Sequence, residues 1–129
     1  MALREVSTGG APRPGGPYSQ GIDSGGFVFV AGQIGTDPVT GQLADGVSAQ
    51  AERALRNIVA VLDAAALTIG DVVKMTVLLA DIADFDTVNG VYARFVADPP
   101  PARTTFAVAA LPRGARVEIE AIAARPGPG

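Results

Sequence analysis

The chain has 129 residues, a net charge of −3, and neither cysteine nor histidine. A domain of this length buries about two thirds of its unfolded surface, so it needs no disulfide or metal to fold. The composition excludes disulfides, Ser-His-Asp and Cys-His catalysis, and nearly all zinc sites. Any catalysis has to use carboxylates, Tyr, Lys, Arg, hydroxyls, backbone groups or water.

The charge balance and the hydropathy also bear on partners and location. Ten Lys and Arg, none clustered, stand against thirteen Asp and Glu, which is a poor basis for binding nucleic-acid phosphates. No apolar run approaches the roughly 18 residues that a membrane-spanning helix needs, and no secretory signal opens the chain. We therefore expect a cytoplasmic protein that binds neither nucleic acid nor membranes.

The first part of the chain predicts an arm followed by a strand. Residues 1–16 are rich in Gly and Pro and indicate an extended arm with one short strand at Leu3–Ser7. Gly25-Gly26 is typical of a tight turn, and the aromatic and β-branched run Phe27–Ala31 predicts a strand. Gly32 ends that run, and residues 37–41 predict a loop.

The apolar residues then change to a helical period. They recur at spacings of three and four from Val47 to Ala65, which predicts a helix at about 47–66 with Gly70 as its stop signal. Residues 72–79 predict a strand, and alternation gives one of its faces Val73, Met75, Val77 and Leu79.

A second helix and two strands are expected in the last part of the chain. Asp81 and Asp84 are candidate caps for a helix whose apolar stripe consists of Phe85, Val88, Tyr92 and Phe95. Residues 99–101 are three prolines, which end that helix. Strands are predicted at 104–109 and 115–123, connected by a turn at 112–114, and residues 125–129 indicate a loose tail.

This mixture of strands and helices predicts one α+β domain over residues 1–129, with the helices on one face of a sheet. The opposite face would carry apolar side chains and remain uncovered in a single chain. Because such a surface rarely stays exposed to water, we expect an oligomer.

Several residues are candidates for chemistry, although each has an ordinary structural interpretation. Arg103 could be a solvated surface charge, and Glu118 and Glu120 share one strand face that could simply be wet. Tyr18 could be a packed loop aromatic. No glycine cluster matches a nucleotide-binding fingerprint. Five motifs nevertheless stand out together: GPYSQG at 16–21, AGQI at 31–34, DFDTVN at 84–89, PART at 101–104 and VEIEAIA at 117–123.

In order and spacing, from about residue 16 to 124, these motifs resemble the signature blocks of the RidA (YjgF-type) reactive-intermediate deaminase family. The resemblance implies a chorismate-mutase-like fold, a mixed sheet with two helices on one face. It also implies a homotrimer whose sheets form a central barrel, with pockets between subunits. Neither a cofactor nor a metal is implied.

The resemblance further implies roles for individual residues. Arg103 corresponds to the arginine that binds the substrate carboxylate, Glu118 to the carboxylate associated with the catalytic water, and Tyr18 to a catalytic-pocket tyrosine. Residues corresponding to substrate-binding positions are Gly32, Asn89 and Thr105. The chain departs from many relatives, which have serine, proline and cysteine in place of Ala31, Gly35 and Thr105. These departures leave the substrate preference open.

The function implied is hydrolytic deamination of small 2-imino or enamine acids, such as 2-aminoacrylate and 2-iminopropionate, to 2-keto acids and ammonia. One alternative is a non-catalytic regulator that binds small carboxylates in the same pocket. Another is a deaminase specialised for one degradation pathway. A ribonuclease activity, claimed for some relatives, is disfavoured by the acidic pI of about 4.7 and the absence of histidine.

Overall fold

The computed structural model describes residues 3–127 and, within them, contains six strands and two α-helices. The strands are β1 (Arg4–Val6), β2 (Gly21–Ser24), β3 (Phe27–Gln33), β4 (Val72–Leu79), β5 (Ala102–Ala107) and β6 (Val117–Ala124). The helices are α1 (Val47–Ala64) and α2 (Phe85–Ala93). Short 3-10 turns lie at Ile69–Asp71, Ile82–Asp84 and Pro112–Gly114. Residues 1–2 of the predicted arm and 128–129 of the predicted tail lie outside the described residues.

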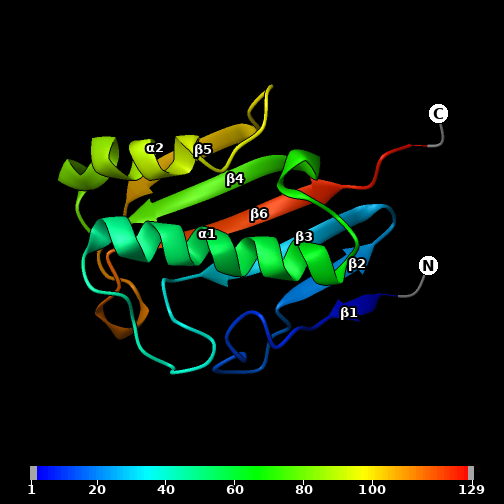
Figure 1. Ribbon diagram of the computed structural model, residues 1–129, viewed down its shortest axis with the longest axis horizontal. Helices are drawn as coiled ribbons and strands as arrows, with labels where there is room; N and C mark the ends of the chain where they lie inside the picture. Colours follow the sequence, from blue (N-terminus) through cyan, green and yellow to red (C-terminus); the bar gives the residue numbers. More distant parts are fainter. Residues whose placement is uncertain (1–2, 128–129) are drawn as a thin grey trace.

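The six strands form one mixed sheet of order β1-β2-β3-β6-β4-β5 (Figure 1). All neighbouring pairs are antiparallel except β4 and β5, which are parallel and are connected through α2. The last strand of the chain, β6, lies between β3 and β4 near the middle of the sheet, while β5 forms one edge. The predicted α+β architecture with a mixed sheet is confirmed.

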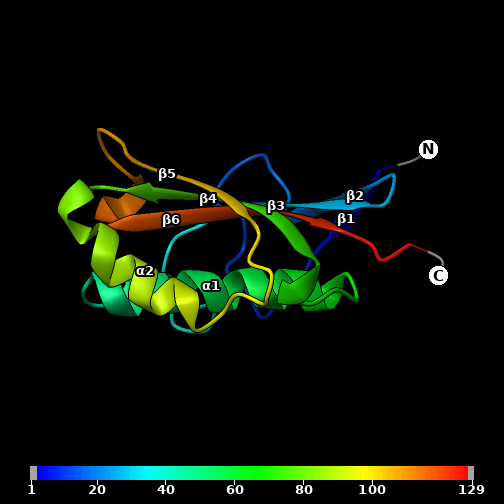
Figure 2. The same ribbon diagram turned by 90° about the horizontal axis from the view of Figure 1, so that it is seen from above.

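Both helices pack on the same face of the sheet (Figure 2). The apolar stripe of α1 places Leu55, Ile58 and Leu62 against that face, and all three are fully buried. On the sheet they meet side chains such as Met75 and Ile119, which are also fully buried. Each buried aliphatic side chain contributes about 1.5–3 kcal/mol, so this single layer contact supplies most of the core.

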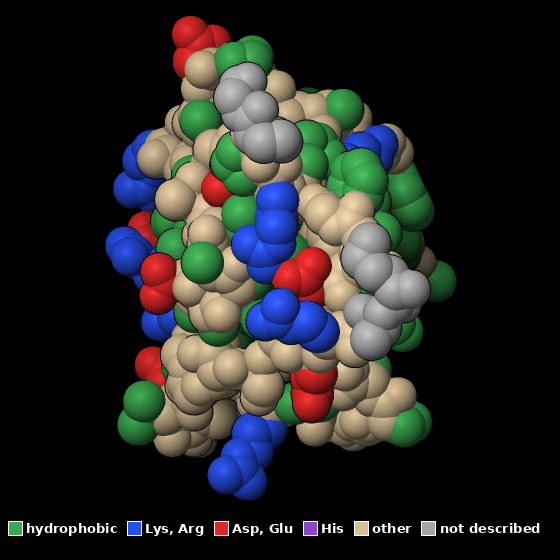
Figure 3. Space-filling model, turned by 90° about the vertical axis from the view of Figure 1, so that its right-hand side faces the viewer, with side chains coloured by type: hydrophobic (Ala, Val, Ile, Leu, Met, Phe, Trp, Pro, Cys, Tyr) green, Lys and Arg blue, Asp and Glu red, His purple; other side chains and the backbone are tan. Residues whose placement is uncertain are grey.

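The other face of the sheet is uncovered and partly apolar. Phe27 and Phe29 on β3 are each 45% exposed, and Phe106 on β5 is 47% exposed. Figure 3 shows the molecule from the right-hand side of Figure 1. Hydrophobic side chains gather along its right margin, away from the helices, whereas most charged side chains lie in the middle and at the left. The predicted uncovered face is therefore present, and a surface of this kind is typical of an interaction site.

Strand β2 was not predicted from the sequence. Its four residues, Gly-Ile-Asp-Ser, have little intrinsic strand preference. The strand forms because Gly25 and Gly26, at φ of 60° and 91°, make a two-residue turn that pairs Ser24 with Phe27. Both positions need positive φ, which glycine adopts without steric cost. The predicted tight turn is thus confirmed as the turn of a hairpin.

The predicted stop signal of the first helix was wrong. The helix ends at Ala64, well before Gly70, which lies in the 3-10 turn Ile69–Asp71. Ala66 takes the left-handed conformation at φ 59°, and the amide of Leu67 donates to Leu62 O at 2.9 Å. This is the Schellman pattern, in which glycine is usual. Burial of Leu67, which is only 4% exposed, compensates the strain on alanine.

The predicted face of β4 also needs one correction. A register shift between Val72 and Lys74 buries Val72 and leaves Val73 45% exposed. Met75, Val77 and Leu79 are fully buried, as expected. Strict alternation therefore fails at the start of the strand, where a bulge rather than the sequence pattern sets the direction of the side chains.

The connections around α2 and β5 differ in detail from those expected. Asp81 caps the 3-10 turn by accepting a hydrogen bond from the amide of Ala83, whereas Asp84 makes no side-chain cap and instead accepts from Arg116 Nη2 at 2.7 Å. Strand β5 begins two residues earlier than predicted. The turn at 112–114 closes no hairpin, because β5 and β6 lie on opposite sides of β4.

Candidate active site

A cavity of about 640 Å³ lies beside β3 and β6, between the N-terminal arm and the turn at 112–114. Three of the residues predicted as functional line it: Tyr18, Gly32 and Glu118. The others that line it are Pro12, Arg13, Gly15, Ala31, Gln33, Ile34, Thr36, Pro112 and Arg113. The structure therefore brings half of the predicted site residues to one cavity.

Glu118 points to the uncovered face of β6, as predicted from alternation along that strand. Burial raises the pKa of its carboxyl group above the usual range, and the neighbouring carboxylate of Glu120 raises it further. Glu120 is exposed and shares the same strand face. A carboxylate with a raised pKa in a partly desolvated cavity is a suitable general base.

Gly32 provides the space that Glu118 occupies. A β-carbon at position 32 would overlap Oε2 of Glu118 and lie 3.0 Å from its Cδ. Residue 32 lies where the pairing of β3 with β6 shifts register, between Val30 and Gln33. The role of Gly32 in the cavity is therefore explained by close approach rather than by a special backbone conformation.

The N-terminal arm forms one wall of the cavity and is fixed by Gln20. The side chain of Gln20 is only 3% exposed; it accepts from the amide of Thr8 at 2.7 Å and donates to Thr8 O, Ala11 O and Pro12 O at 3.0, 3.1 and 2.9 Å. This role of Gln20 was not predicted, although the residue belongs to the GPYSQG motif. A buried carboxamide with all its groups bonded holds the adjacent backbone in place.

Tyr18 lies on the same wall and is 54% exposed. Its hydroxyl accepts a hydrogen bond from the amide of Gly15 at 3.2 Å, which fixes the direction of the ring. The phenol is thus held at the mouth of the cavity, where it can contact a bound molecule.

Arg103 lies elsewhere, on the helix-covered face of the sheet. In the register of β4 and β5 it is opposite the buried Met75. Its guanidinium lies over the rings of Tyr92 and Phe85, at 4.7 and 5.7 Å from their centroids. Within residues 3–127 it pairs with no carboxylate. Two aromatic faces therefore hold a cation whose hydrogen-bond donors are available to a ligand.

Thr105 and Asn89 accompany Arg103 rather than Glu118. Thr105 follows Arg103 by two residues on β5, so its side chain has the same direction, and its Oγ1 is buried without a hydrogen-bond partner in the described part of the chain. Asn89 lies on α2 four residues after Phe85 and three before Tyr92, which places the three on one helix face. These residues form a second group around the guanidinium.

Tyr92 was predicted as part of the apolar stripe of the second helix, and its contact with Arg103 was missed. Its hydroxyl is buried and has no hydrogen-bond partner among residues 3–127. Burial raises the pKa of this phenol, while the positive charge of Arg103 opposes that effect. The ring therefore stays neutral and serves as a flat support for the guanidinium.

The six predicted site residues thus form two groups, and the sheet separates them. Tyr18, Gly32 and Glu118 belong to a cavity reached from the uncovered face, whereas Arg103, Thr105 and Asn89 lie on the helix side at the β5 edge. A single chain does not bring the guanidinium of Arg103 to the carboxylate of Glu118.

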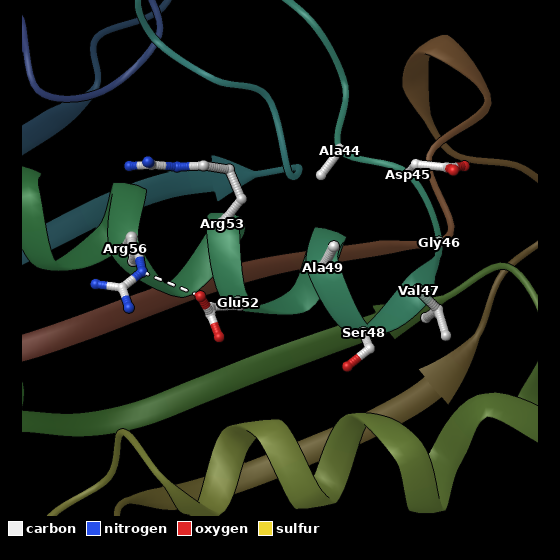
Figure 4. A pocket seen from close by; sticks show the side chains of 9 residues that line it. All are labelled: Ala44, Asp45, Gly46, Val47, Ser48, Ala49, Glu52, Arg53 and Arg56. Carbon is white, nitrogen blue, oxygen red and sulfur yellow. Dashed lines mark hydrogen bonds and ion pairs between the residues drawn. The ribbon is translucent and has the colours of Figure 1, made fainter.

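A second cavity, of about 660 Å³, lies at the N-terminal end of α1 and contains none of the predicted site residues (Figure 4). Its charged side chains bond mostly to one another or to neighbours. Glu52 pairs with Arg56 at 3.4 Å and with Arg94 at 3.1 Å, and Arg53 donates to Asn57 Oδ1 at 3.1 Å. Such a surface offers little unsatisfied charge to a ligand.

Nowhere in residues 3–127 do three His, Cys, Asp or Glu side chains come together in a way that could hold a metal ion. None of the helices in the same range is long and apolar enough to cross a membrane.

Comparison with known proteins shows the class to which the fold and the cavity belong. The model of the family described as Endoribonuclease L-PSP matches residues 8–125. A protein of Salmonella typhimurium named 2-iminobutanoate/2-iminopropanoate deaminase is 46% identical over 125 residues, which are 95% of this chain and 98% of that protein.

Solved structures agree with this class. The YjgF gene product of E. coli superposes with a TM-score of 0.91 at 42% identity, covering 95% of this chain and 99% of that one. The structure of E. coli TdcF with bound serine gives the same TM-score, identity and coverage. The chain therefore belongs to the RidA (YjgF-type) family, as the sequence motifs indicated.

Proposed function

We propose that this protein is a cofactor-free deaminase that hydrolyses 2-imino acids to 2-keto acids and ammonia. The observation that carries the proposal is the half-buried Glu118, with its raised pKa, which lines the cavity and occupies the space that Gly32 leaves for it. The name and the 46% identity of the Salmonella relative support the same reaction. Related imino and enamine acids, such as 2-aminoacrylate, are within this substrate class.

The chemistry needs only groups that the chain supplies. The guanidinium of Arg103 binds the substrate carboxylate through two parallel charge-assisted hydrogen bonds and so fixes its orientation. A water molecule attacks the imine carbon while Glu118 accepts one of its protons. The resulting carbinolamine takes a proton at nitrogen, its C–N bond breaks, and ammonia leaves as the C=O bond forms. Tyr18 contacts the reacting molecule from the mouth of the cavity.

The separation of Arg103 from Glu118 supports a site made by two subunits. We place Arg103, with Thr105 and Asn89, on one subunit and Glu118, with Gly32 and Tyr18, on its neighbour. The uncovered apolar face supports assembly, and the homotrimer with a central barrel of sheets is the arrangement that the family resemblance implies. Light scattering after gel filtration tests this, with an expected mass three times that of the 13.0 kDa chain.

The activity is tested by ammonia release from freshly generated 2-iminopropionate or 2-iminobutyrate, with semicarbazide as a competing trap. Faster clearance by wild-type protein, lost in Glu118→Gln, supports the proposal. Saturable binding of small carboxylates without any turnover would instead identify a regulatory carboxylate-binding protein.

The family description names a ribonuclease, so RNA is a second substrate worth testing. The net charge of −3 disfavours binding along the phosphates of an RNA strand, and the absence of histidine removes the usual acid–base pair of a ribonuclease. Incubation with single-stranded RNA should leave it intact under conditions in which the imino acid is hydrolysed.

A further inference from the structure

We propose that Arg13 and Arg113 form a second anion-binding subsite at the rim of the Glu118 cavity, and that it favours imino acids with a second carboxylate in the side chain. This inference rests on the proposed deaminase function and specifies its substrate class. The substrates expected are small 2-imino dicarboxylates, which yield 2-oxo dicarboxylates and ammonia on hydrolysis.

The charges that line the cavity differ from those of the whole chain. The chain carries a net charge of −3, yet two guanidinium groups line this cavity against one carboxylate, that of Glu118. The second carboxylate on the same strand face, Glu120, is not among the lining residues. An excess of positive charge inside a cavity of an acidic protein indicates a ligand with more than the usual negative charge.

Arg13 is held rigidly at the rim. It stands between Pro12 and Pro14, whose rings fix the backbone on both sides. The carbonyl of Pro12 is one of the acceptors of the buried Gln20 side chain, at 2.9 Å. Within residues 3–127 the guanidinium of Arg13 pairs with no carboxylate. Because the backbone is already fixed, binding of an anion orders only the side chain of Arg13, whose guanidinium is unpaired.

Arg113 reaches the same cavity from the opposite wall. Its backbone takes the left-handed conformation, at φ 58° and ψ 23°, which is uncommon outside glycine, asparagine and aspartate. Its Nη2 donates to Gly41 O at 3.0 Å, which anchors the side chain and leaves other guanidinium N–H groups free. Strained backbone that persists beside a cavity is a recurrent feature of functional sites.

The two arginines stand apart from the reacting end of the cavity. Within residues 3–127 neither arginine forms an ion pair with Glu118, although all three line the same cavity. Both guanidinium groups are therefore available to a ligand that occupies the cavity. In the proposed mechanism Arg103 binds the α-carboxylate, so Arg13 and Arg113 are free to bind a carboxylate at the far end of the substrate side chain. A cavity of about 640 Å³ is large enough for a molecule of this size.

The test compares kcat/KM for 2-iminosuccinate or 2-iminoglutarate with kcat/KM for 2-iminobutyrate, all generated in place by amino acid oxidases. Arg13→Gln and Arg113→Gln should each lower the dicarboxylate-to-monocarboxylate ratio about threefold to tenfold, a range set by exposed charge-assisted hydrogen bonds. The wild-type ratio should also fall as salt rises from 0.05 to about 0.5 M, because screening weakens an exposed charge pair.

Arg4→Gln is the matched control, since it removes the same charge from the exposed strand β1, away from the cavity. It should leave the ratio unchanged. Equal losses on both substrates in Arg13→Gln, or an unchanged ratio in both rim variants, would overturn the subsite, while activity of the wild-type protein on 2-iminobutyrate would still support the proposed deaminase function. A wild-type protein without activity on any imino acid would overturn the proposed function itself.

Discussion

Gly32 of β3 lies directly against the carboxylate of Glu118 on β6, so closely that a β-carbon at residue 32 would overlap Oε2. The two residues are 86 positions apart in sequence (118 − 32), and only the pairing of β3 with β6 brings them together. The contact makes the direction of the Glu118 side chain depend on a residue that has no side chain of its own.

Gly32→Ala should therefore impair catalysis more than stability. The added methyl group displaces the Glu118 carboxyl toward the open cavity, and a small misplacement of a base can lower the rate about a hundredfold. The melting temperature should change little, because the displaced group is half-buried and can move. Measurement of kcat/KM beside thermal unfolding checks this, and normal activity would show that Glu118 needs no fixed position.

Glu118→Gln should lower kcat about a hundredfold to ten-thousandfold, the usual contribution of a general base, with substrate binding largely kept. Glu120→Gln is the matched control, since Glu120 is two residues along the same face but exposed and outside the cavity lining. The reverse pattern, with Glu120→Gln inactive and Glu118→Gln active, would transfer the catalytic role to Glu120.

The pH dependence should reveal the coupling of these two carboxylates. Because burial and Glu120 raise the pKa of Glu118, the acid limb of the kcat/KM profile should lie above the pH of an ordinary glutamate. Glu120→Gln removes the second of these causes and should move the limb to lower pH. An acid limb that stays in place would show that Glu120 does not influence the base.

The raised pKa of Glu118 also predicts how the stability of the folded protein depends on pH: ionisation of this carboxyl group lowers the stability, although the same ionised form is the one that acts as a base. A carboxyl group with a raised pKa binds its proton more tightly in the folded protein than in the unfolded chain. Stability is therefore lost as the pH rises from the usual glutamate range through the raised pKa of Glu118. Glu118→Gln removes this loss, so the variant should melt at a higher temperature than wild type at pH 7 and not at pH 3.

Arg103→Lys keeps the charge and loses the bidentate fork, so kcat/KM on 2-iminopropionate should fall about tenfold to a hundredfold. Arg103→Ala should lose more, together with about 0.5–1 kcal/mol from its stacking on Tyr92 and Phe85. Both variants should still fold. Near-normal activity in Arg103→Ala would show that Arg103 does not bind the substrate carboxylate.

The sequence predicted the helices, the uncovered sheet face and the side-chain directions of β6 because those features follow from local apolar periodicity. It missed β2, whose composition is polar and whose pairing depends on a turn. It also took Gly70 as the stop signal of α1, whereas the helix ends at Ala64 and Ala66 takes the left-handed conformation. The family motifs named Arg103 and Glu118 together. The two residues lie on opposite faces of the sheet because of how β5 and β6 pair with β4, and a local sequence pattern does not predict such a pairing.

Two further contacts could not be predicted for the same reason: the hydrogen bonds by which Gln20 fixes the N-terminal arm, and the packing of Arg103 on the rings of Tyr92 and Phe85. The side chain of Gln20 bonds to Thr8, Ala11 and Pro12, which precede it in the chain by eight to twelve residues. Arg103 contacts Tyr92 of α2, about ten residues earlier in the chain, because that helix packs over β5. Both residues stood inside recognised motifs, so the signal was present, but the geometric role required the fold.

The central claim is that Arg103 of one subunit and Glu118 of its neighbour form one deaminase site, and mixed assemblies test it most directly. Arg103→Ala and Glu118→Gln chains, each with a different tag, are co-expressed and double-tagged oligomers are isolated. Each variant alone should be nearly inactive on 2-iminopropionate. A site that takes Arg103 from the Glu118→Gln chain and Glu118 from the Arg103→Ala chain is intact, and each mixed trimer has one such site out of three, so the double-tagged oligomers should show roughly a third of wild-type activity. Mixed oligomers as inactive as either parent would contradict a site shared between subunits.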